Sequence, residues 1–487
     1  MLEINRTGIL IKPNNARVLF RPFQFVGEGR YLKIIARVLS LTEEEADEQA
    51  KSILAEFEGR HYQLSRYFLK RFEDIKPYIF TDAEISMTRR IVLGSYFTME
   101  YALESAALFN PSMVWHPDQN DLPEGSRRFV VSLRAVGEGH LSSLSFHTGI
   151  VDNKNQITLD EDSPFVTAPD PVPHTTYEKK LFVRKLQELV QTSDGQFSNA
   201  PPELLILLPD TFTLTELQQA VETLRRANRN KPAEFDLSVK GVMMLALANY
   251  EIEYPANTNL TERIIFPYSP TEQNGIEDAR FVRFTDDDGS VRYYATYTAY
   301  DGRVALPQIL ETEDFTHFRV STLNGPEVRN KGMALFPRKI NGLFAMISRQ
   351  DNENIYLMYS DSLHFWYTKQ ILLKPTYPWE FVQLGNCGSP IEIDEGWLVL
   401  SHGVGAMRKY SIGAFLLDKN DPGKVLGRTR EPILSPNAQE REGYVPNVVY
   451  SCGGVIHGRE LIVPYAMSDY ASSFFTVSVD DVLEAMN

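Results

Sequence analysis

The sequence predicts a mainly β protein, with a β-propeller favoured over a sandwich, together with an N-terminal helical module and a helical insertion. The chain has 487 residues, enough for one large β unit with attachments. From about residue 110 onward, short runs rich in Val, Ile, Phe and Tyr alternate with Gly, Asn, Asp and Pro. Several runs are separated by DG or NG, which are hairpin turn signals. No repeated motif gives the number of blades.

The first 105 residues predict an extension of short strands and helices. A helix is expected to begin after Thr42, a plausible N-cap followed by three glutamates, and to continue through residues 46–75. A second helix is expected from Thr81 to about Phe109, because apolar residues recur there at intervals of three and four. Strands are expected at residues 9–13, 17–23 and 32–41.

Residues 106–487 predict the β unit, in which one stretch departs from the strand pattern. Residues of about 175–230 have a helical pattern, with a Pro-rich entry, and are interpreted as an insertion. The clearest strand candidates are residues 127–136, 141–151, 279–284, 291–300, 342–350, 354–360, 397–404, 410–418 and 461–469.

Composition excludes several classes of function. Lys and Arg total 49 against 64 Asp and Glu, a net charge of −15, which argues against nucleic acid as the partner. A small anion is still compatible with a local basic cluster. No apolar run has the length of a membrane span, and the start lacks the apolar core of a signal peptide, so a cytoplasmic protein is expected. Two cysteines, Cys387 and Cys452, give no disulfide framework.

Four clusters are candidates for chemistry. The adjacent carboxylates Glu277 and Asp278 open a strand, where alternation would place them on opposite faces and Arg280 on the face of Asp278. A turn with a salt-bridged aspartate and a general acid at a strand end are both open. Two interpretations are also open for the basic residues. They lie on a solvated face, or they converge on an anion. The clusters are residues 134–140, 274–280, 401–404, and the set Lys331, Arg338, Lys339 and Arg349.

Other templates are missing from the sequence. There is no phosphate-binding GxxxxGK[ST] loop, no dinucleotide-binding glycine pattern between a strand and a helix, and no HExxH. The GNCGSP segment around Cys387 lacks the spacing of a nucleophile elbow. His140 and His147 have no evident third ligand, so no metal site is predicted.

At these clusters the sequence resembles glycoside hydrolase family 130, the β-mannoside phosphorylases and related mannosidases. The resemblance runs from about Phe109 to the C-terminus and depends on the order of the motifs. They are FNPS (109–112), SLRAVGEGH (132–140), NGIEDARFV (274–282), ALFPRKINGLF (334–344), SDSLHFW (360–366), GSPIEIDEGWLVLSHGV (388–404), YSIGAFLLD (410–418) and EREGYVPNVVYSCGGV (440–455).

The resemblance implies a five-bladed β-propeller with the sugar site in its central depression. It implies cleavage of a β-mannosidic bond with inversion, by phosphate in the phosphorylases, which gives α-mannose 1-phosphate. It assigns the acid to Asp278, whose proton reaches the leaving oxygen through a sugar hydroxyl. The carboxylate-spacing rule for inverting hydrolases therefore does not apply directly. No cofactor is expected besides inorganic phosphate as co-substrate, and the expected partner is a β-linked manno-oligosaccharide, with no nucleic acid and no membrane.

The resemblance places the phosphate ligands at Lys331, Arg349, Gln383 and His402. Many members have Arg at the position of Lys331, and some have Lys at the position of Gln383, so Arg338 is a candidate to compensate. Because neither Gln383 nor His402 has become acidic, phosphorolysis is favoured over hydrolysis. Hydrolysis by water and a non-catalytic glycan-binding propeller are the alternatives.

For the mannosyl unit the resemblance assigns Asn110, Arg134 and Asp469. A structural pair with Glu138 is the alternative for Arg134. The two cysteines are expected only to pack. The linkage and the acceptor stay open, and a homo-oligomer is expected from the helical extension. Further candidates for sugar contact are Glu277, Arg280, Tyr410, Glu440 and Tyr444.

Overall fold

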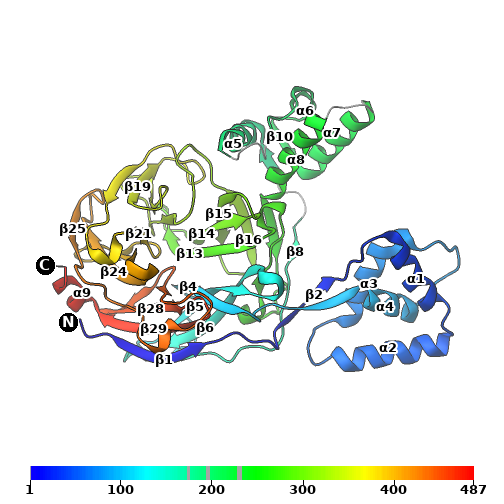
Figure 1. Cartoon of the computed structure of the whole chain (residues 1–487), viewed down its shortest axis with the longest axis horizontal. Helices are drawn as coiled ribbons and strands as arrows, with labels where there is room; N and C mark the ends of the chain where they lie inside the picture. Colours follow the sequence, from blue (N-terminus) through cyan, green and yellow to red (C-terminus); the bar gives the residue numbers. More distant parts are fainter. Residues whose placement is uncertain (1, 173–175, 193–197, 228–232, 487) are drawn as a thin grey trace.

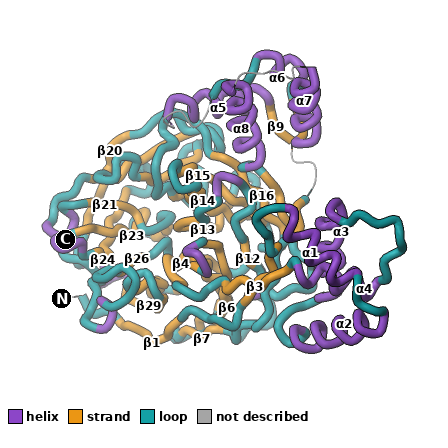
Figure 2. The backbone as a smooth tube through the Cα atoms, turned by 45° about the vertical axis from the view of Figure 1, so that its right-hand side comes forward, coloured by secondary structure: helices purple, strands orange, loops and turns teal. Residues whose placement is uncertain are grey.

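The computed structural model describes residues 2–172, 176–192, 198–227 and 233–486. A β unit carries two helical bodies that project from it on one side (Figure 1). The strands gather in the β unit and most of the helices lie outside it (Figure 2). The predicted mainly β class is therefore confirmed. Within these ranges, no helix is long and apolar enough to cross a membrane.

The first two sheets of the β unit are antiparallel and hold the central part of the chain. In the first, β7 also pairs with β6 beside the main order β12-β6-β5-β4. The second has the order β13-β14-β15-β16-β11-β8. Their strands are β4 (Ala107–Trp115), β5 (Arg127–Val136), β6 (Ser142–Val151), β7 (Ile157–Leu159), β8 (Asp170–Pro171), β11 (Tyr250–Glu253), β12 (Ile264–Ile265), β13 (Ile276–Thr285), β14 (Val291–Tyr300), β15 (Ala305–Thr312) and β16 (His317–Thr322).

Three further antiparallel sheets follow along the chain. Their orders are β17-β18-β19-β20, then β21-β23-β24-β25 with β22 on β23, then β1-β29-β28-β26 with β27 on β28. Their strands are β1 (Asn5–Ile11), β17 (Ala334–Leu335), β18 (Phe344–Ser348), β19 (Ile355–Ser360), β20 (Gln370–Leu373), β21 (Gln383–Asn386), β22 (Ile391–Ile393), β23 (Gly396–Val404), β24 (Tyr410–Leu417), β25 (Val425–Arg428), β26 (Val449–Tyr450), β27 (Val455–His457), β28 (Glu460–Met467) and β29 (Ala471–Ser478).

The five sheets form a ring, because each contacts the next in chain order. The contacts join β4 to β13, β14 to β17, β18 to β21, and β24 to β26. The ring closes where β28 of the fifth sheet contacts β4 of the first. Strand β1 pairs with β29, so the beginning of the chain completes the sheet formed by its end. Buried apolar residues fill the spaces between neighbouring sheets, for example between the first and fifth.

The N-terminal helical body corrects one predicted strand. Residues 32–41 were expected to be extended, but residues 32–39 belong to a helix whose buried Ile35 and Val38 lie three apart on one face. That spacing outweighs the strand preference of the β-branched residues. Thr42 is confirmed as an N-cap, because its Oγ1 accepts from the amide of Glu45 at 3.1 Å. The helices are α1 (Glu28–Leu39), α2 (Glu43–Phe57), α3 (Leu64–Ile75) and α4 (Met87–Tyr96).

The second predicted helix is also shorter than expected. It was to run from Thr81 to about Phe109, but α4 ends at Tyr96 and a strand begins at Thr98. The reason is tertiary, since β3 pairs with β2 along its whole length and β4 enters the first sheet. The two strands of this ribbon are β2 (Val18–Pro22) and β3 (Thr98–Ala102).

The second helical body lies between β8 and β11, which pair with each other in the second sheet. Its helices continue beyond the predicted end near residue 230, because α8 extends to Leu247 and packs buried Val239, Val242 and Leu245 into the main core. Its elements are β9 (Thr176–Glu178), α5 (Lys179–Thr192), α6 (Pro202–Leu207), β10 (Thr211–Thr213), α7 (Leu214–Ala227) and α8 (Ala233–Leu247).

Short helices occupy several turns and the end of the chain. The final helix is α9 (Val479–Glu484), which follows β29 directly. The single-turn 3₁₀ helices are Lys76–Tyr78, Glu138–His140, Leu260–Glu262, Pro270–Glu272, Pro378–Glu380, Ala406–Arg408 and Gln439–Arg441.

A buried ion pair fixes the N-terminal segment to the β unit. Arg17 Nη1 lies 2.6 Å from Glu104 Oε1, and both side chains are almost fully removed from solvent. Arg17 Nη2 also donates to the carbonyl of Thr261 at 2.5 Å. The pair joins the segment before β2, the segment after β3 and the segment before β12, so three parts of the chain distant in sequence depend on it.

We predict that Arg17→Met lowers the apparent free energy of unfolding by about 3–5 kcal/mol, because it leaves Glu104 as a buried unpaired charge. Urea denaturation followed by circular dichroism measures the effect. Arg226→Ala, which removes an exposed pair with Glu222, is the control and should change stability by no more than about 0.5 kcal/mol. A loss below about 1 kcal/mol for Arg17→Met would contradict the role of the pair.

Candidate active site

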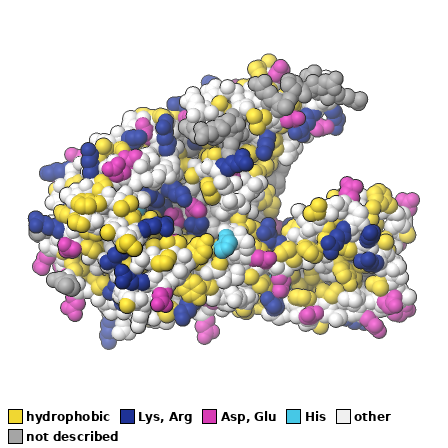
Figure 3. Space-filling view, viewed as in Figure 1, with side chains coloured by type: hydrophobic (Ala, Val, Ile, Leu, Met, Phe, Trp, Pro, Cys, Tyr) yellow, Lys and Arg dark blue, Asp and Glu magenta, His cyan; other side chains and the backbone are white. Residues whose placement is uncertain are grey.

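The site is built from inner strands of neighbouring sheets. Asn110 lies in β4, Arg134 in β5, and Glu277, Asp278 and Arg280 lie at the start of β13. Lys331 follows in the segment that joins β16 to β17. Basic and acidic side chains lie side by side near the middle of the ring (Figure 3).

A bulge at Asp278 overturns the expected alternation of the carboxylates. The β13–β14 register shifts between Glu277 and Arg280, and Asp278 has a φ of +54°. Both carboxylates therefore face Arg134, whose guanidinium lies 2.9 Å from Glu277 and 3.9 Å from Asp278. The prediction that only one of them reaches a given site was wrong, because it assumed a regular strand.

A second irregularity in β4 meets the first. The β4–β5 register shifts between Phe109 and Ser112, and Asn110 has a φ of +51°. Its Nδ2 donates to Asp278 Oδ1 at 2.6 Å. Asn110 Oδ1 is buried without a hydrogen-bond partner among the described residues. The amide thus orients the carboxylate and still has an acceptor to offer to a ligand.

Positive charge keeps Asp278 ionised in the free protein. Burial is the largest influence on its pKa and raises it, but Arg280, Arg134, Lys331 and the Asn110 hydrogen bond together hold the pKa below its ordinary value. Arg280 itself is buried and donates to the carbonyl of Asp278 at 2.8 Å. A bound anion would weaken this positive field and favour the protonated acid.

The carboxylate of Glu277 connects two sheets and the segment that leads into a third. One oxygen accepts from Arg134 at 2.9 Å, and the other accepts a short bond from the Lys331 ammonium. The alternative partner of Arg134, Glu138, is not the one the structure shows. Arg134 also lies 5.2 Å from the centre of the Phe109 ring. Lys331 is therefore positioned at the site through Glu277.

A second cationic group forms beside Lys331, where two glycines permit close approach. A Cβ at Gly332 would lie 2.6 Å from Arg349 Cγ. A Cβ at Gly385 would lie 2.8 Å from Arg349 Cδ and 2.5 Å from His402 Cε1. Any larger residue at these two positions would displace Arg349 or His402, so the glycines bring Arg349 between Lys331 and His402.

His402 and Arg349 have buried polar atoms that the described residues do not satisfy. Neither ring nitrogen of His402 and not the Nε of Arg349 has a hydrogen-bond partner there. Burial, and next the charge of Arg349, lowers the pKa of His402 well below its usual range, so the ring is neutral at pH 7. Unsatisfied buried donors are costly, and here they indicate an anion site.

The other two predicted phosphate ligands differ in placement. Gln383 lies on β21 two residues from Gly385, so its side chain shares the sheet face of Gly385. Arg338 does not join the group, which corrects the expectation that it compensates. It lies in the turn between β17 and β18, away from Lys331 and Arg349, and binds Glu392 at 2.8 and 2.9 Å.

The residues that were predicted to contact the sugar lie in different surroundings. Asp469 lies within the electrostatic influence of Asp278 and Arg134, and burial, followed by the charge of Asp278, raises its pKa to about 6. Tyr410 stacks 5.9 Å from His402. Tyr444 is exposed, and its ring lies 5.7 Å from the ring of His140, so it lies at the rim of the candidate site.

Glu440 is a structural residue and not a free sugar ligand. Its carboxylate binds Arg6 at 2.9 Å and accepts from Tyr465 at 2.7 Å. Strand β1 supplies Arg6, so the pair helps to hold that strand in the fifth sheet. Sequence could not show this, because Arg6 and Glu440 lie at opposite ends of the chain.

Tyr450 was not predicted from the sequence, and it connects Arg280 to His402 at the candidate site. Its hydroxyl accepts from Arg280 at 2.6 Å, and its ring lies 4.9 Å from that of His402. A tyrosine in an apolar strand gives no signal of such a role. Cys387 and Cys452 are buried and free, as expected for packing residues.

The sequence model of a family described as beta-1,4-mannooligosaccharide phosphorylase matches residues 239–487. The chain belongs to glycoside hydrolase family 130. The family predicted from the ordered motifs is confirmed. The matched range includes Asp278, Lys331, Arg349 and His402, whereas Asn110 and Arg134 lie before it and are brought to Asp278 by the fold.

Relatives in family 130 differ in the linkage that their names specify. A 1,2-beta-oligomannan phosphorylase of Thermoanaerobacter sp. (strain X514) is 35% identical over 47% of this chain and 75% of its own length. A beta-1,4-mannooligosaccharide phosphorylase of Ruminococcus albus is 34% identical over 32% of this chain and 50% of its own. The solved beta-1,2-mannobiose phosphorylase of Listeria innocua has 22% identity and a TM-score of 0.47, covering 79% of this chain and 93% of that one.

We predict that Asp469→Asn stabilises this family 130 protein by about 1 kcal/mol at pH 7.5. The folded pKa of about 6 exceeds the ordinary value, so the favourable contribution of Asp469 is complete below about pH 4 and is lost as the pH rises through 6. Asparagine never ionises and tolerates the φ of +51° at this position.

Thermal unfolding at pH 7.5 and pH 4 measures this effect. The stabilisation should largely disappear at pH 4, where the wild-type carboxyl is protonated in the folded protein and is close to its ordinary pKa in the unfolded chain. Glu124→Gln, at an exposed turn position, is the control and should show no such pH dependence. An equal effect of Asp469→Asn at both pH values would contradict the raised pKa.

Proposed function

We propose that the chain is an inverting β-mannoside phosphorylase, which uses inorganic phosphate to cleave a β-linked manno-oligosaccharide and releases α-mannose 1-phosphate. The observation that carries the proposal is the anion site beside the acid. Lys331, Arg349 and His402 lie near Asp278, and the buried Nε of Arg349 and the ring nitrogens of His402 have no hydrogen-bond partner among the described residues. The names of the family 130 relatives support the same activity.

The proposal includes a five-bladed β-propeller as the catalytic domain. The ring of five antiparallel sheets supports it, with the site at the inner strands. The proposed catalytic domain is residues 106–487 with the helical insert, and β1 of the 1–105 extension completes the fifth blade. The helical body of this extension is proposed to mediate self-association, and the cytoplasm is proposed as the location because a sugar phosphate is retained there.

In the proposed reaction, a phosphate oxygen attacks the anomeric carbon from the face opposite the leaving group. The glycosidic C–O bond breaks, and the leaving oxygen takes a proton that Asp278 supplies through a sugar hydroxyl. Phosphate is already an anionic nucleophile, so no second carboxylate has to act as base. Lys331, Arg349, His402 and Gln383 orient the phosphate, which contributes through positioning and charge stabilisation.

Phosphate also explains how an ionised Asp278 becomes an acid. Its pKa is held down by surrounding cations in the free protein. A phosphate anion beside Lys331 and Arg349 offsets that field and raises the pKa of the carboxyl. Asp278 therefore holds the proton more readily when the nucleophile is bound. Asn110, Arg134 and Asp469 would hold the mannosyl unit next to it.

We predict that Asp278→Asn lowers the rate of mannose 1-phosphate formation by at least about 10²-fold while the fold stays intact, because a positioned acid contributes about 10²–10⁴-fold. The assay incubates the protein with β-1,2- or β-1,4-mannobiose, with and without phosphate, and measures mannose 1-phosphate and free mannose. Asp121→Asn is the matched control, since Asp121 is exposed and has a similar φ of +57°.

The outcomes of this assay separate the candidate functions. Mannose 1-phosphate formed only with phosphate establishes phosphorolysis, and the disaccharide that reacts identifies the linkage. Free mannose at equal rates in both buffers would instead establish the hydrolytic alternative. An unchanged rate in Asp278→Asn would show that the acid is another group.

We predict that phosphate raises the melting temperature of the wild-type protein and that Arg349→Met weakens this effect at least tenfold in phosphate concentration. A ligand bound only by the native state stabilises it by RT ln(1 + [L]/Kd), about 2.7 kcal/mol at 100 times Kd. Arg338→Met is the matched control, because Arg338 lies in the turn between β17 and β18 and pairs with Glu392. Equal responses in the two variants would contradict the placement of the anion site.

A further inference from the structure

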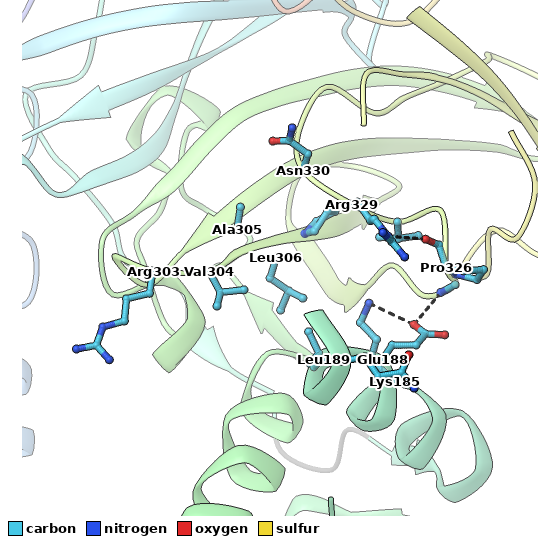
Figure 4. Close-up of a pocket in the computed structure, with 14 residues that line it drawn as sticks. Lys185, Glu188, Leu189, Arg303, Val304, Ala305, Leu306, Pro326, Arg329 and Asn330 are labelled. Atoms are coloured by element: carbon cyan, nitrogen blue, oxygen red, sulfur yellow. Dashed lines mark hydrogen bonds and ion pairs between the residues drawn. The ribbon is translucent and has the colours of Figure 1, made fainter. Parts of the chain in front are cut away.

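A cavity of about 710 Å³ lies between helix α5 and the β unit (Figure 4). One wall is the segment that joins β16 to β17, which contributes Pro326, Arg329 and Asn330. The next residue in this segment is Lys331, whose ammonium binds Glu277 at the candidate active site. The cavity lining and the candidate active site are therefore adjacent along this segment of the chain.

The opposite wall is α5, and it is firmly attached to the β unit. Lys185 is buried, and its Nζ donates to the carbonyl of Leu323 at 2.6 Å. Glu188 accepts from the amide of Gly325 at 3.0 Å. The guanidinium of Arg184 lies 3.8 Å from the centre of the Phe365 ring. These contacts fix the distance between the helical insert and the segment that carries Lys331.

The lining combines apolar and polar groups in the manner of a sugar site. Leu189, Leu306 and Val328 are buried apolar residues of the lining, and sugar rings present apolar C–H faces to such surfaces. Arg303 and Arg329 are exposed, and neither forms an ion pair with any residue in the described ranges. Arg329 Nε donates to the carbonyl of Pro326 at 2.9 Å, so the Nη groups of Arg329 and the guanidinium of Arg303 are the donors available to sugar hydroxyls.

The volume lies within the range of about 300–1,000 Å³ that is typical of ligand pockets. A chain of linked sugars needs an elongated, partly open site that continues from the cleaved bond. A free metabolite would need no such continuity. The step of one residue from Asn330 in the cavity to Lys331 at the candidate active site therefore favours the oligosaccharide as the occupant over an unrelated small anion.

We propose that this cavity holds mannosyl units of the leaving-group chain beyond the cleaved bond, and that α5 of the helical insert sets the preferred chain length. The inference rests on the proposed phosphorylase function and names a specificity element for it. Chains longer than mannobiose gain contacts with Arg303, Arg329 and α5. Mannobiose, which is too short to extend into the cavity, does not.

The first experiment measures binding without turnover. The full-length Asp278→Asn protein is titrated calorimetrically with β-mannobiose, β-mannotriose and β-mannotetraose of both 1,2 and 1,4 linkage. Affinity should rise about tenfold from the disaccharide to the tetrasaccharide in one linkage series. Adding Arg303→Ala and Arg329→Ala should remove this rise and leave the affinity for mannobiose within twofold. Adding Arg226→Ala instead, at an exposed arginine of α7 outside the cavity, should preserve the rise.

The second experiment tests the helical wall itself. Gln191 is exposed on α5 and lines the cavity, whereas Gln187 is exposed on the same helix outside it. In the protein with native Asp278, Gln191→Trp should raise KM for the tetrasaccharide at least fivefold and leave KM for mannobiose unchanged. Gln187→Trp should leave both KM values unchanged.

The outcomes distinguish this inference from the function on which it rests. Equal affinity for all chain lengths, or an equal loss for all lengths in the arginine variant, would overturn the chain-length role while phosphorolysis stands. If the protein binds and cleaves no β-mannoside of any length, the proposed function fails and this inference with it. A rise in affinity that survives both Arg303→Ala and Arg329→Ala would place the longer chain elsewhere.

Discussion

The paired bonds of Glu277 to Arg134 and Lys331 are the interaction around which the site is arranged. They tie a strand of the first sheet, a strand of the second and the segment leading into the third. A carboxylate between two cations at the centre of a ring fixes the sheets relative to one another where their inner strands meet. Asp278 follows Glu277 directly, so the bonds of Glu277 also fix the position of the acid.

The backbone at this junction is as important as the side chains. Asn110 and Asp278 both adopt left-handed conformations at irregularities in β4 and β13. Such conformations are unfavourable for non-glycine residues and are found where the surrounding structure enforces them. Here they direct an amide and a carboxylate toward each other at 2.6 Å. A regular strand would have turned one of them away.

The free protein also holds an anion site in advance of its ligand. His402 and Arg349 retain buried donors that the described residues leave unpaired, and Gly332 and Gly385 provide the space that this arrangement needs. Fixed donors in a buried site do not have to reorganise during a reaction, which is how preorganised sites stabilise charge. The burial of unpaired donors is unfavourable, and it is offset by the well-packed apolar cores of the sheets, which keep the inner strands in place.

The sequence by itself determined the β-rich class, the N-cap at Thr42 and the family, and it named most of the residues that the structure gathers at the candidate site. Each of these features depends on the local spacing of residues or on the order of motifs. Both can be read from the sequence without knowledge of the fold. The sequence misassigned residues 32–41 as a strand because β-branched composition and helical spacing pointed in different directions. It also ended the second helix too late, since the pairing of β3 with β2 lies outside local sequence.

Only the tertiary structure decided which charged residues meet. Arg338 carries the right charge in the right motif, but the turn between β17 and β18 places it beside Glu392. Glu440 pairs with Arg6 from the other end of the chain, and Tyr450 joins Arg280 to the surroundings of His402. Residue type and spacing fix what a side chain can do. Strand register, bulges and the closure of the ring fix its neighbours, because those depend on contacts between segments far apart in sequence.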